Sequence, residues 1–477
     1  MVKEQDVRNG SASAGELSRS EASPAGRIQR EVPLSYQQQM RLRRDVAFLD
    51  ANRPIDNHPA GAVYSVTGPF DVVAFEQACG DLLVRHPVLT IGYSLTSGVP
   101  QTGYLLDPAL FRVRHAESVT ALANATNAVH RSAFAPDDFK IQITWAPSTG
   151  SETGRILIAA DQIAVDGNSW TTLLRDLSQA YELRLRGRSL AELEPAADYA
   201  QYAAEQRASL MSAELTGRMA YWRGQLDPLA PFGEEVLAGA RRPPAGPRSA
   251  RQIRYSFDFD LLLAAQETGT TPFSLAMAVH AAVRYVRSGR SVVTTHCTAD
   301  LRGAEYANSV GWFSGVLVVR HKVAVDDTPA ELGSALLGSV FDAVDNAVPL
   351  AILQQELEPD RLRSRHWQPM CFLDVRDMED QNSLQLAGCT LTEIEDDLSL
   401  PGLRDGVACW FTSAGQRTDL LMQFEAEAWT RDHAETFVAD LEYVFDLVLQ
   451  DRDCTIAEMA DRDWPEQRQP RNKVLFT

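Results

Sequence analysis

Residues 155–170 read Arg-Ile-Leu-Ile-Ala-Ala-Asp-Gln-Ile-Ala-Val-Asp-Gly-Asn-Ser-Trp. The run from Arg155 to Ala160 is short and apolar, as expected of a strand that is buried on both faces. A turn at Asp166-Gly167 follows, and apolar residues then recur with helical period at Trp170, Leu173, Leu174, Leu177 and Tyr181. The stretch therefore predicts a strand, a sharp loop and a helix, an arrangement that presents loop side chains to a cleft.

The same alternation of strands and helices continues on both sides of this stretch. Asp71 is placed to cap a helix whose apolar positions lie on one face, and Thr271-Pro272 begins a second helix that ends at Gly289. A cluster of prolines, glycines and charges at 241–248 marks a linker. We expect a disordered tail at 1–31, an N-terminal lobe at 32–225, a linker at 226–252, a C-terminal lobe at 253–460 and a flexible tail at 461–477.

Composition excludes several classes of protein. The chain has 477 residues, 45% hydrophobic and 23% charged, which is enough for a large core. Its net charge of −19 argues against general nucleic-acid binding, which needs clustered Lys and Arg. No apolar run approaches the ~20 residues that span a bilayer, and the first thirty residues contain no apolar secretion segment. Six scattered cysteines without a CxxC pair predict reduced thiols in a cytoplasmic protein.

Signatures of other enzyme classes are absent from the sequence. It contains no GxSxG elbow, P-loop or GxGxxG fingerprint, and no residues with the spacing of zinc ligands. Triad hydrolases, nucleotide-dependent enzymes and metalloenzymes are therefore poor alternatives, and we expect neither a metal nor a bound cofactor.

Several short motifs occur in order between about residue 33 and residue 460. They are Leu34–Arg41, Leu83–Leu89, Asp161–Gly167, Asp198–Ala200 with Tyr221-Trp222, Thr298–Arg302 and Val310–Phe313. In this order the chain resembles the stand-alone condensation domains of nonribosomal peptide synthetases and the related polyketide-associated acyltransferases of the chloramphenicol-acetyltransferase superfamily. One departure is Thr90, which stands where the second motif of the family usually has Arg.

This resemblance implies a fold and an activity. The implied fold is an α/β, V-shaped pseudo-dimer of two chloramphenicol-acetyltransferase-like sandwich lobes with a central channel. The implied activity is that of a condensation-type acyltransferase in natural-product (antibiotic) biosynthesis. A partner carrier protein, acting in trans, would bring the acyl or aminoacyl thioester on its phosphopantetheine, and a small-molecule acceptor would enter from the other end.

Asp161–Gly167 occupies the place of the HHxxxDG motif of the family. The resemblance implies that Asp166 is buried and paired with an arginine, for which Arg302 is the best candidate. Removing one member of a buried ion pair costs ~3–5 kcal/mol, which favours a structural role for Asp166. We expect Gly167 to give the loop its tight backbone.

The second histidine of the motif, which lies beside the incoming nucleophile in the family, is Gln162 here. An amide side chain exchanges no proton near neutral pH, so Gln162 cannot be a general base. Losing such a base typically costs ~10²–10⁴-fold in rate. Two interpretations stay open. In the first, the site positions an acceptor that is already basic, such as an amine, and proximity alone can lower the reaction barrier by ~7–11 kcal/mol. In the second, the site binds a carrier-tethered intermediate for another enzyme.

Further residues complete the predicted site. His296 could face the channel from its strand, although a packing role is the more ordinary interpretation. Asp161 replaces the first histidine, and we expect it to contact substrate together with Ser169, Trp170 and Trp312. Asn168 or Ser169 could also simply cap the following helix. Gly311, in the Val310–Phe313 motif, is expected to be structural.

Overall fold

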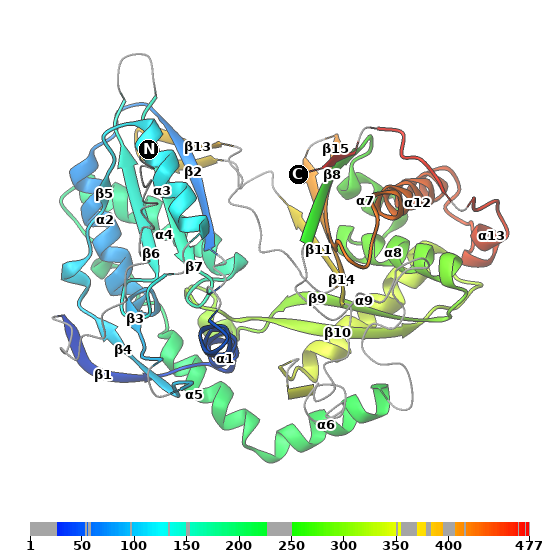
Figure 1. Cartoon of the computed structure of the whole chain (residues 1–477), viewed down its shortest axis with the longest axis horizontal. Coiled ribbons are helices and arrows are strands. Elements are labelled where there is room, and N and C mark those ends of the chain that lie inside the picture. Colours follow the sequence, from blue (N-terminus) through cyan, green and yellow to red (C-terminus); the bar gives the residue numbers. More distant parts are fainter. Residues whose placement is uncertain are drawn as a thin grey trace, which may run out of the picture.

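The computed structural model describes residues 26–476 except for the short stretches 53–54, 56–58, 96–97, 132–133, 149–152, 350–351, 378–382, 415, 466 and 473 and the longer stretches 227–249, 354–369 and 395–405. Figure 1 shows two lobes that meet at the lower part of the molecule and diverge above it, in the expected V shape. Most of the predicted linker and of the predicted N-terminal tail lie outside the described residues.

The N-terminal lobe is built on a six-stranded sheet with the order β12-β13-β2-β7-β6-β5. Helices α2 (Val72–Arg85) and α4 (Gly167–Leu185) pack on one face, and α3 (Val119–Arg131) packs on the other face. The strands are β2 (Pro59–Thr67), β5 (Arg114–His115), β6 (Ile141–Ala146), β7 (Arg155–Asp161), β12 (Ser383–Leu386) and β13 (Cys389–Ile394).

A small sheet at the base of this lobe has the order β1-β4-β3. Its strands are β1 (Arg27–Pro33), β3 (Ile91–Gly92) and β4 (Thr102–Leu106), and helices α1 (Tyr36–Asp50) and α5 (Tyr199–Leu210) lie nearby. Strand β1, which pairs along β4, thus includes residues 27–31, which were expected to belong to the tail.

The C-terminal lobe is built on a seven-stranded sheet with the order β10-β9-β11-β14-β15-β8-β16. Its strands are β8 (Ala250–Phe257), β9 (Val292–Asp300), β10 (Ser314–Lys322), β11 (Met370–Asp377), β14 (Gly406–Ala414), β15 (Arg417–Glu425) and β16 (Leu475–Phe476). Its helices are α7 (Leu261–Thr268), α8 (Pro272–Ser288), α9 (Pro329–Asp345), α12 (Arg431–Gln450) and α13 (Ile456–Ala460).

Helix ends follow the capping residues that the sequence indicated. Asp71 accepts hydrogen bonds from the N–H groups of Val73 and Ala74 at the start of α2. Thr271 caps α8, Pro272 is its first residue, and Gly289 ends it in the left-handed conformation with φ +68°. These predicted boundaries are confirmed.

The two lobes exchange elements, so the predicted lobe boundaries do not coincide with the packing. The β12–β13 hairpin comes from the C-terminal half, but β13 pairs with β2 of the N-terminal sheet. Helix α6 (Ala213–Leu226) comes from the N-terminal half, but its Trp222 lies in the C-terminal core. Figure 1 shows α6 crossing beneath both lobes.

The C-terminal segment also differs from its expectation. Residues 461–477 were expected to form a flexible tail, yet β16 pairs with β8 at the edge of the sheet. The side-chain amide of Asn472 donates to the carbonyl oxygen of Ser256 at 3.0 Å, which fixes the approach to that edge. The strand pairing together with contacts of Arg471 and Asn472 holds this end in place.

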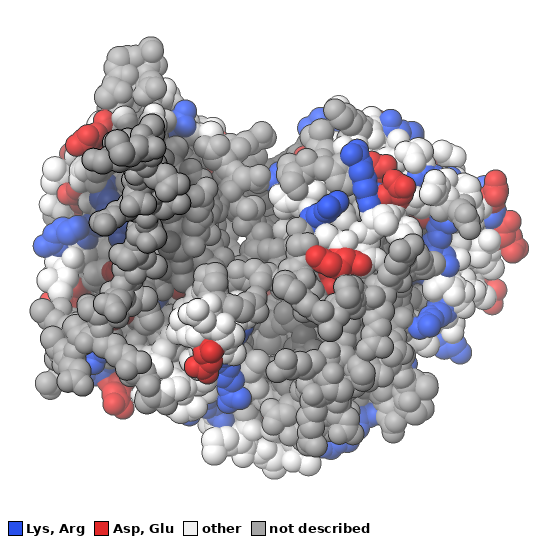
Figure 2. Space-filling view, viewed as in Figure 1, with Lys and Arg blue, Asp and Glu red and all other residues white. Residues whose placement is uncertain are grey.

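Surface charge is distributed without a dominant stripe on the face seen in Figure 2. Basic and acidic side chains are interspersed there over the described part of both lobes. Within the described residues, no helix has both the length and the apolar character required to span a bilayer.

Candidate functional site

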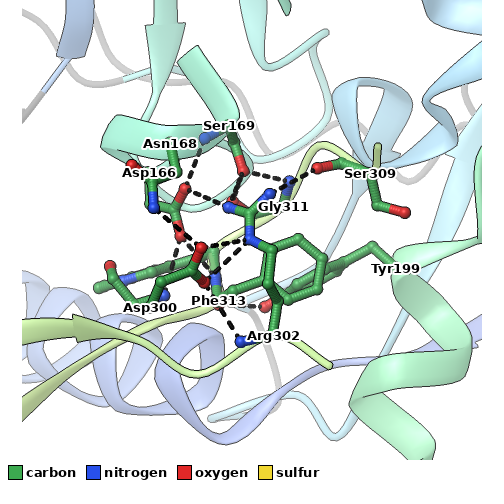
Figure 3. Close-up of polar contacts among 11 residues, drawn as sticks. Asp166, Asn168, Ser169, Tyr199, Asp300, Arg302, Ser309, Gly311 and Phe313 are labelled. Atoms are coloured by element: carbon green, nitrogen blue, oxygen red, sulfur yellow. Dashed lines mark hydrogen bonds and ion pairs between the residues drawn. The ribbon is translucent and has the colours of Figure 1, made fainter. Parts of the chain in front are cut away.

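Asp166 lies at the junction between the lobes and caps α4. Its Oδ1 accepts from the N–H of Ser169 at 2.8 Å, and its Oδ2 accepts from the N–H groups of Phe313 and Ser314, both at 2.8 Å. Arg302 Nη2 lies 3.2 Å from Oδ1. The structure thus contains the predicted buried ion pair, and four donors from three chain segments hold one carboxylate (Figure 3).

Arg302 reaches Asp166 from the segment that follows β9. Its guanidinium lies over the ring of Phe313, with 4.5 Å between Cζ and the ring centroid. Its Nη1 donates to the carbonyl oxygen of Ser309 at 3.2 Å, and its Nε donates to Asp300 at 2.8 Å. These contacts hold the Arg302 guanidinium in one orientation, so it is well suited to join the two lobes.

Ser169 and Gly311 form a second contact between the same segments. The Ser169 hydroxyl donates to the carbonyl oxygen of Gly311 at 2.7 Å and accepts from its N–H at 3.0 Å. Ser169 is fully buried, so its hydroxyl is committed to Gly311 and Arg302. This burial does not support the substrate contact expected for Ser169, and the capping interpretation is wrong, because Asp166 is the residue that caps α4.

Gly311 packs directly against an aromatic ring. A Cβ built there would overlap Cδ2 of Tyr199, well inside van der Waals contact. Tyr199 cannot retreat, because its hydroxyl donates to the carbonyl oxygen of Trp312 at 2.7 Å and its ring meets Phe313 edge to face at 5.0 Å. The geometry therefore supports the structural role expected for Gly311.

Gln162 lies on a turn that is fixed on both sides. The N–H of Ile163 donates to Asp161 Oδ1 at 3.1 Å, and the N–H of Ala164 donates to the carbonyl oxygen of Asp161 at 2.9 Å. Gln38 of α1 donates to the carbonyl oxygen of Ile163 at 2.8 Å. Gln162 itself is half-buried, so a turn with a fixed backbone presents this residue partly to solvent.

Asp161 is placed differently from the substrate contact that we expected. It is 1% exposed, and its carboxylate lies 3.7 Å from Nη1 of Arg41, a buried residue of α1 that also pairs with Asp45 at 3.0 Å. Lys140 is buried nearby, and burial lowers its pKa to about 8 although Asp161 acts in the opposite direction. The carboxylate therefore belongs to an internal ionic cluster beneath the turn, where it fixes the loop.

Gly167 is the first residue of α4 and faces open space. A Cβ built at this position meets no atom within 4 Å, and its backbone is not in the left-handed region. The tight-backbone explanation is therefore not supported. The exposed residue next to it, Asn168, donates from its side-chain amide to Asp300 at 2.8 Å.

The remaining predicted residues lie in two places. Trp170 and Trp312 are half-buried and pack against the N-terminal core, leaving part of each indole exposed. His296 lies on β9 in the C-terminal sheet, opposite Val318, and is 1% exposed. A substrate cannot contact His296 in this arrangement, so a catalytic role for it stays a prediction that this burial does not favour.

Two contributors to the site were missed in the sequence. Arg41 was noticed only as part of a motif, and Asp300 only as a neighbour of Arg302. An arginine and an aspartate four residues apart, Arg41 and Asp45, were a visible signal of a helical ion pair. Asp300 had a local partner in Arg302, two residues along the chain, but its contact with Asn168, 132 residues away, left no signal in the sequence.

The candidate site combines the Gln162 amide, the exposed start of α4 and the Asp166–Arg302 junction between the lobes. Within the described residues, no cluster of His, Cys, Asp or Glu is placed to hold a metal ion. Such a site can orient two substrates and donate hydrogen bonds. Comparison with known proteins identifies the class of chemistry. The Condensation domain family model matches residues 28–459. The chain belongs to the condensation domain family.

Relatives of this condensation domain are parts of much larger synthetases. Isonitrile lipopeptide synthase of Mycobacterium tuberculosis is 26% identical over 357 residues, covering 70% of this chain and 14% of that protein. The probable non-canonical nonribosomal peptide synthetase CymA of Salinispora arenicola is 25% identical over 429 residues, covering 86% of this chain and 5% of that protein. The chain thus spans a small fraction of the length of these relatives.

Solved structures confirm the fold. The X-domain from teicoplanin biosynthesis superposes with a TM-score of 0.71 at 19% identity, covering 92% of this chain and 98% of that chain. The condensation domain from the Monacolin K polyketide synthase MokA gives a TM-score of 0.69 at 15% identity, covering 91% and 100%. The predicted family and the chloramphenicol-acetyltransferase-like pseudo-dimer are confirmed, and family membership implies acyl transfer in natural-product biosynthesis.

Proposed function

We propose that this condensation domain joins a carrier-tethered acyl or aminoacyl thioester to a small-molecule amine and forms an amide. The observation that carries the proposal is Gln162 on a fixed turn beside an intact Asp166–Arg302 junction. The scaffold that positions substrates is retained, whereas the group that would remove a proton is replaced by an amide. A site of this kind favours an acceptor that needs no deprotonation before it attacks.

The proposed reaction needs no base for its overall balance. The amine nitrogen attacks the thioester carbonyl carbon, the C–N bond forms, and the C–S bond breaks. The proton that the nitrogen loses ends on the departing phosphopantetheine thiol. Gln162 can donate from its side-chain N–H₂ to the carbonyl oxygen or accept from the amine N–H, and proximity supplies the rest of the rate enhancement. An alcohol would have to lose its proton as it attacks, so esters are disfavoured.

Partners and location follow from the same proposal. A carrier protein in trans would supply the phosphopantetheine thioester, and the chain itself would carry no cofactor. Cys79, Cys389 and Cys454 are free and buried, which fits a reducing, cytoplasmic setting.

The test presents an acyl-loaded carrier and candidate amines to the protein and follows the acyl group by intact mass. Transfer should survive in Gln162→Ala within about tenfold, and should fall by about 100-fold in Asp166→Asn, because small misplacement of substrates is costly. Asp107→Asn, which caps a short helix and takes no part in the junction, is the matched control. Gln162→His should add activity toward alcohols. Loss of amine transfer in Gln162→Ala as large as in Asp166→Asn would contradict positional catalysis.

A second candidate function is a binding module that holds a carrier-tethered intermediate for another enzyme. The observation that favours it is the likeness to the teicoplanin X-domain, a domain whose structure is also known in complex with OxyB. The two functions differ in one result. If no amine accepts the acyl group while the protein still binds the loaded carrier, the binding module is the correct function.

A further inference from the structure

Glu393 is a half-buried carboxylate that no cation accompanies. It lies on β13, the strand that the C-terminal half of the chain adds to the N-terminal sheet. Within the described part of the chain, no side chain forms an ion pair or a hydrogen bond with its carboxylate. Burial raises the pKa of Glu393, and no nearby cation opposes that rise. A carboxylate in this state gains more from a cationic partner than an exposed carboxylate does.

The neighbouring strand places a second unsatisfied group on the same face of the sheet. Tyr64 of β2 lies directly opposite Glu393 in the antiparallel register, where paired Cβ atoms are about 4.5–5.5 Å apart. Tyr64 is 1% exposed, and within the described residues its hydroxyl has no hydrogen-bond partner. Burial raises the pKa of Tyr64, and the nearby charge of Glu393 adds to the rise.

Trp170 completes this group of side chains. Its indole N–H approaches the Tyr64 hydroxyl and acts against the rise in pKa, but it lies outside the geometry of a hydrogen bond. Trp170 is half-buried and packs against the same core as Tyr64. The hydroxyl oxygen of Tyr64 therefore keeps its capacity to accept a hydrogen bond from a further donor.

The position of the three side chains relates them to the candidate site. Trp170 lies in the first turn of α4, about one helical turn from the cap Asp166. Figure 1 shows β2 and β13 on the side of the N-terminal lobe that faces the C-terminal lobe. The group is thus next to the Asp166–Arg302 junction, but it shares no side chain with it.

We propose that Glu393 and Tyr64, with the Trp170 indole beside them, bind a cationic group of the acceptor that is not its attacking nitrogen. This inference rests on the proposed amide-forming function and adds a substrate class to it, namely amines that carry a second, cationic amino group. An ammonium group can donate one hydrogen bond to the carboxylate and another to the tyrosine oxygen. The bound nitrogen keeps its protons throughout, and the other nitrogen attacks in its neutral form, so the reaction still needs no base.

The kinetic test compares butylamine with 1,4-diaminobutane, which has the same four-carbon chain and one further amino group. In Glu393→Gln the KM for 1,4-diaminobutane should rise about tenfold, because a charge-assisted hydrogen bond is lost, while the KM for butylamine stays unchanged. Tyr64→Phe removes only the hydroxyl and should raise the KM for 1,4-diaminobutane about threefold. An equal rise of both KM values in Glu393→Gln would overturn the inference.

Glu76→Gln is the matched control for the loss of a negative charge. Glu76 lies on α2 and pairs with His115 at 2.7 Å, at the opposite edge of the same sheet from β13. This variant should change neither KM value. A rise for 1,4-diaminobutane as large as in Glu393→Gln would show that the diamine responds to the overall charge of the protein, and the proposed subsite would be wrong.

A binding measurement separates this inference from the proposed function. Saturation-transfer NMR should detect butylammonium on the wild-type protein and a weaker signal on Glu393→Gln, whereas the signal of the neutral probe butan-1-ol should be the same on both. If acyl transfer is absent from the wild type but this difference is present, the proposed function fails and the subsite stands. If transfer to butylamine occurs but Glu393→Gln changes neither probe, water alone bridges the carboxylate and the hydroxyl, and the inference is overturned. Thermal unfolding of each variant shows whether an effect comes from misfolding.

Discussion

At the scale of single residues, the packing of Gly311 against Tyr199 sets a steric limit at the junction. Gly311→Ala places a Cβ onto a ring that Trp312 and Phe313 hold in place. We expect a loss of about 1–3 kcal/mol in the free energy of unfolding, as for other overpacked cores. Urea denaturation of the variant measures it.

Gly167→Ala is the matched control for that prediction. Its Cβ would point into open space at the first turn of α4, where alanine is at least as favourable as glycine. We expect a stability equal to or slightly above that of the wild type. Equal stability of the two variants would show that Tyr199 can move, contrary to the packing described.

At the level of single residues, the sequence predicted the ion pair of Asp166, because a buried carboxylate needs a cationic partner. A buried Asp166 needs a cation, and the motif order singled out Arg302, which is the observed partner. The two backbone donors at Phe313 and Ser314 could not be foreseen, because a backbone N–H leaves no mark in the side-chain pattern. Asp161 was misplaced for a related reason: burial at a strand end depends on α1, which is distant in sequence.

At the scale of elements, α6 shows how far a helix can be from the lobe that its position in the chain suggests. Its Trp222 is 2% exposed in the C-terminal core, and its indole N–H donates to the carbonyl oxygen of Asn346 at 2.7 Å. Trp222→Ala removes a large buried side chain and leaves that carbonyl without its donor. We expect a loss of about 3–5 kcal/mol in the free energy of unfolding.

The control for Trp222→Ala is a nearby apolar residue in the same helical pair. Met211, at the end of α5, is 88% exposed, and Met211→Ala should change stability by less than about 0.5 kcal/mol. Urea denaturation followed by tryptophan fluorescence compares the two variants. A small effect of Trp222→Ala would mean that α6 can detach from the C-terminal lobe without cost to its core.

Local signals predicted the elements but not their partners. Asp71, Thr271 and Gly289 fixed helix ends correctly, because capping depends on residues close in sequence. The β12–β13 hairpin and α6 joined the opposite lobes through contacts across more than a hundred residues, as in the pairing of Glu393 with Tyr64. Hydrophobic periodicity indicates which face of a helix or strand is buried, but it does not indicate which lobe that face packs against.

At the scale of the whole molecule, each lobe buries a neutral histidine. His86 lies in the N-terminal lobe, 2.9 Å from Asp176, and burial lowers its pKa even though Asp176 acts in the opposite direction. His280 lies in α8 of the C-terminal lobe against the ring of Phe437, and burial lowers its pKa well below the ordinary range. Both lobes therefore respond to acid in the same way.

The stability of the protein should consequently fall as the pH drops below about 6.5, the ordinary pKa of histidine. In that range both histidines take up a proton in the unfolded chain but stay neutral in the folded chain, so the free energy of unfolding decreases. Between pH 7.5 and 5.5 we expect a loss of about 1 kcal/mol at His280, whose pKa lies well below the ordinary value, and a further loss of the same sign at His86. Urea denaturation at both pH values measures it, with His280→Leu as the comparison: its pH-dependent loss should be smaller than that of the wild type. A variant with the full wild-type slope would show that His280 is already protonated in the fold, which its apolar surroundings oppose.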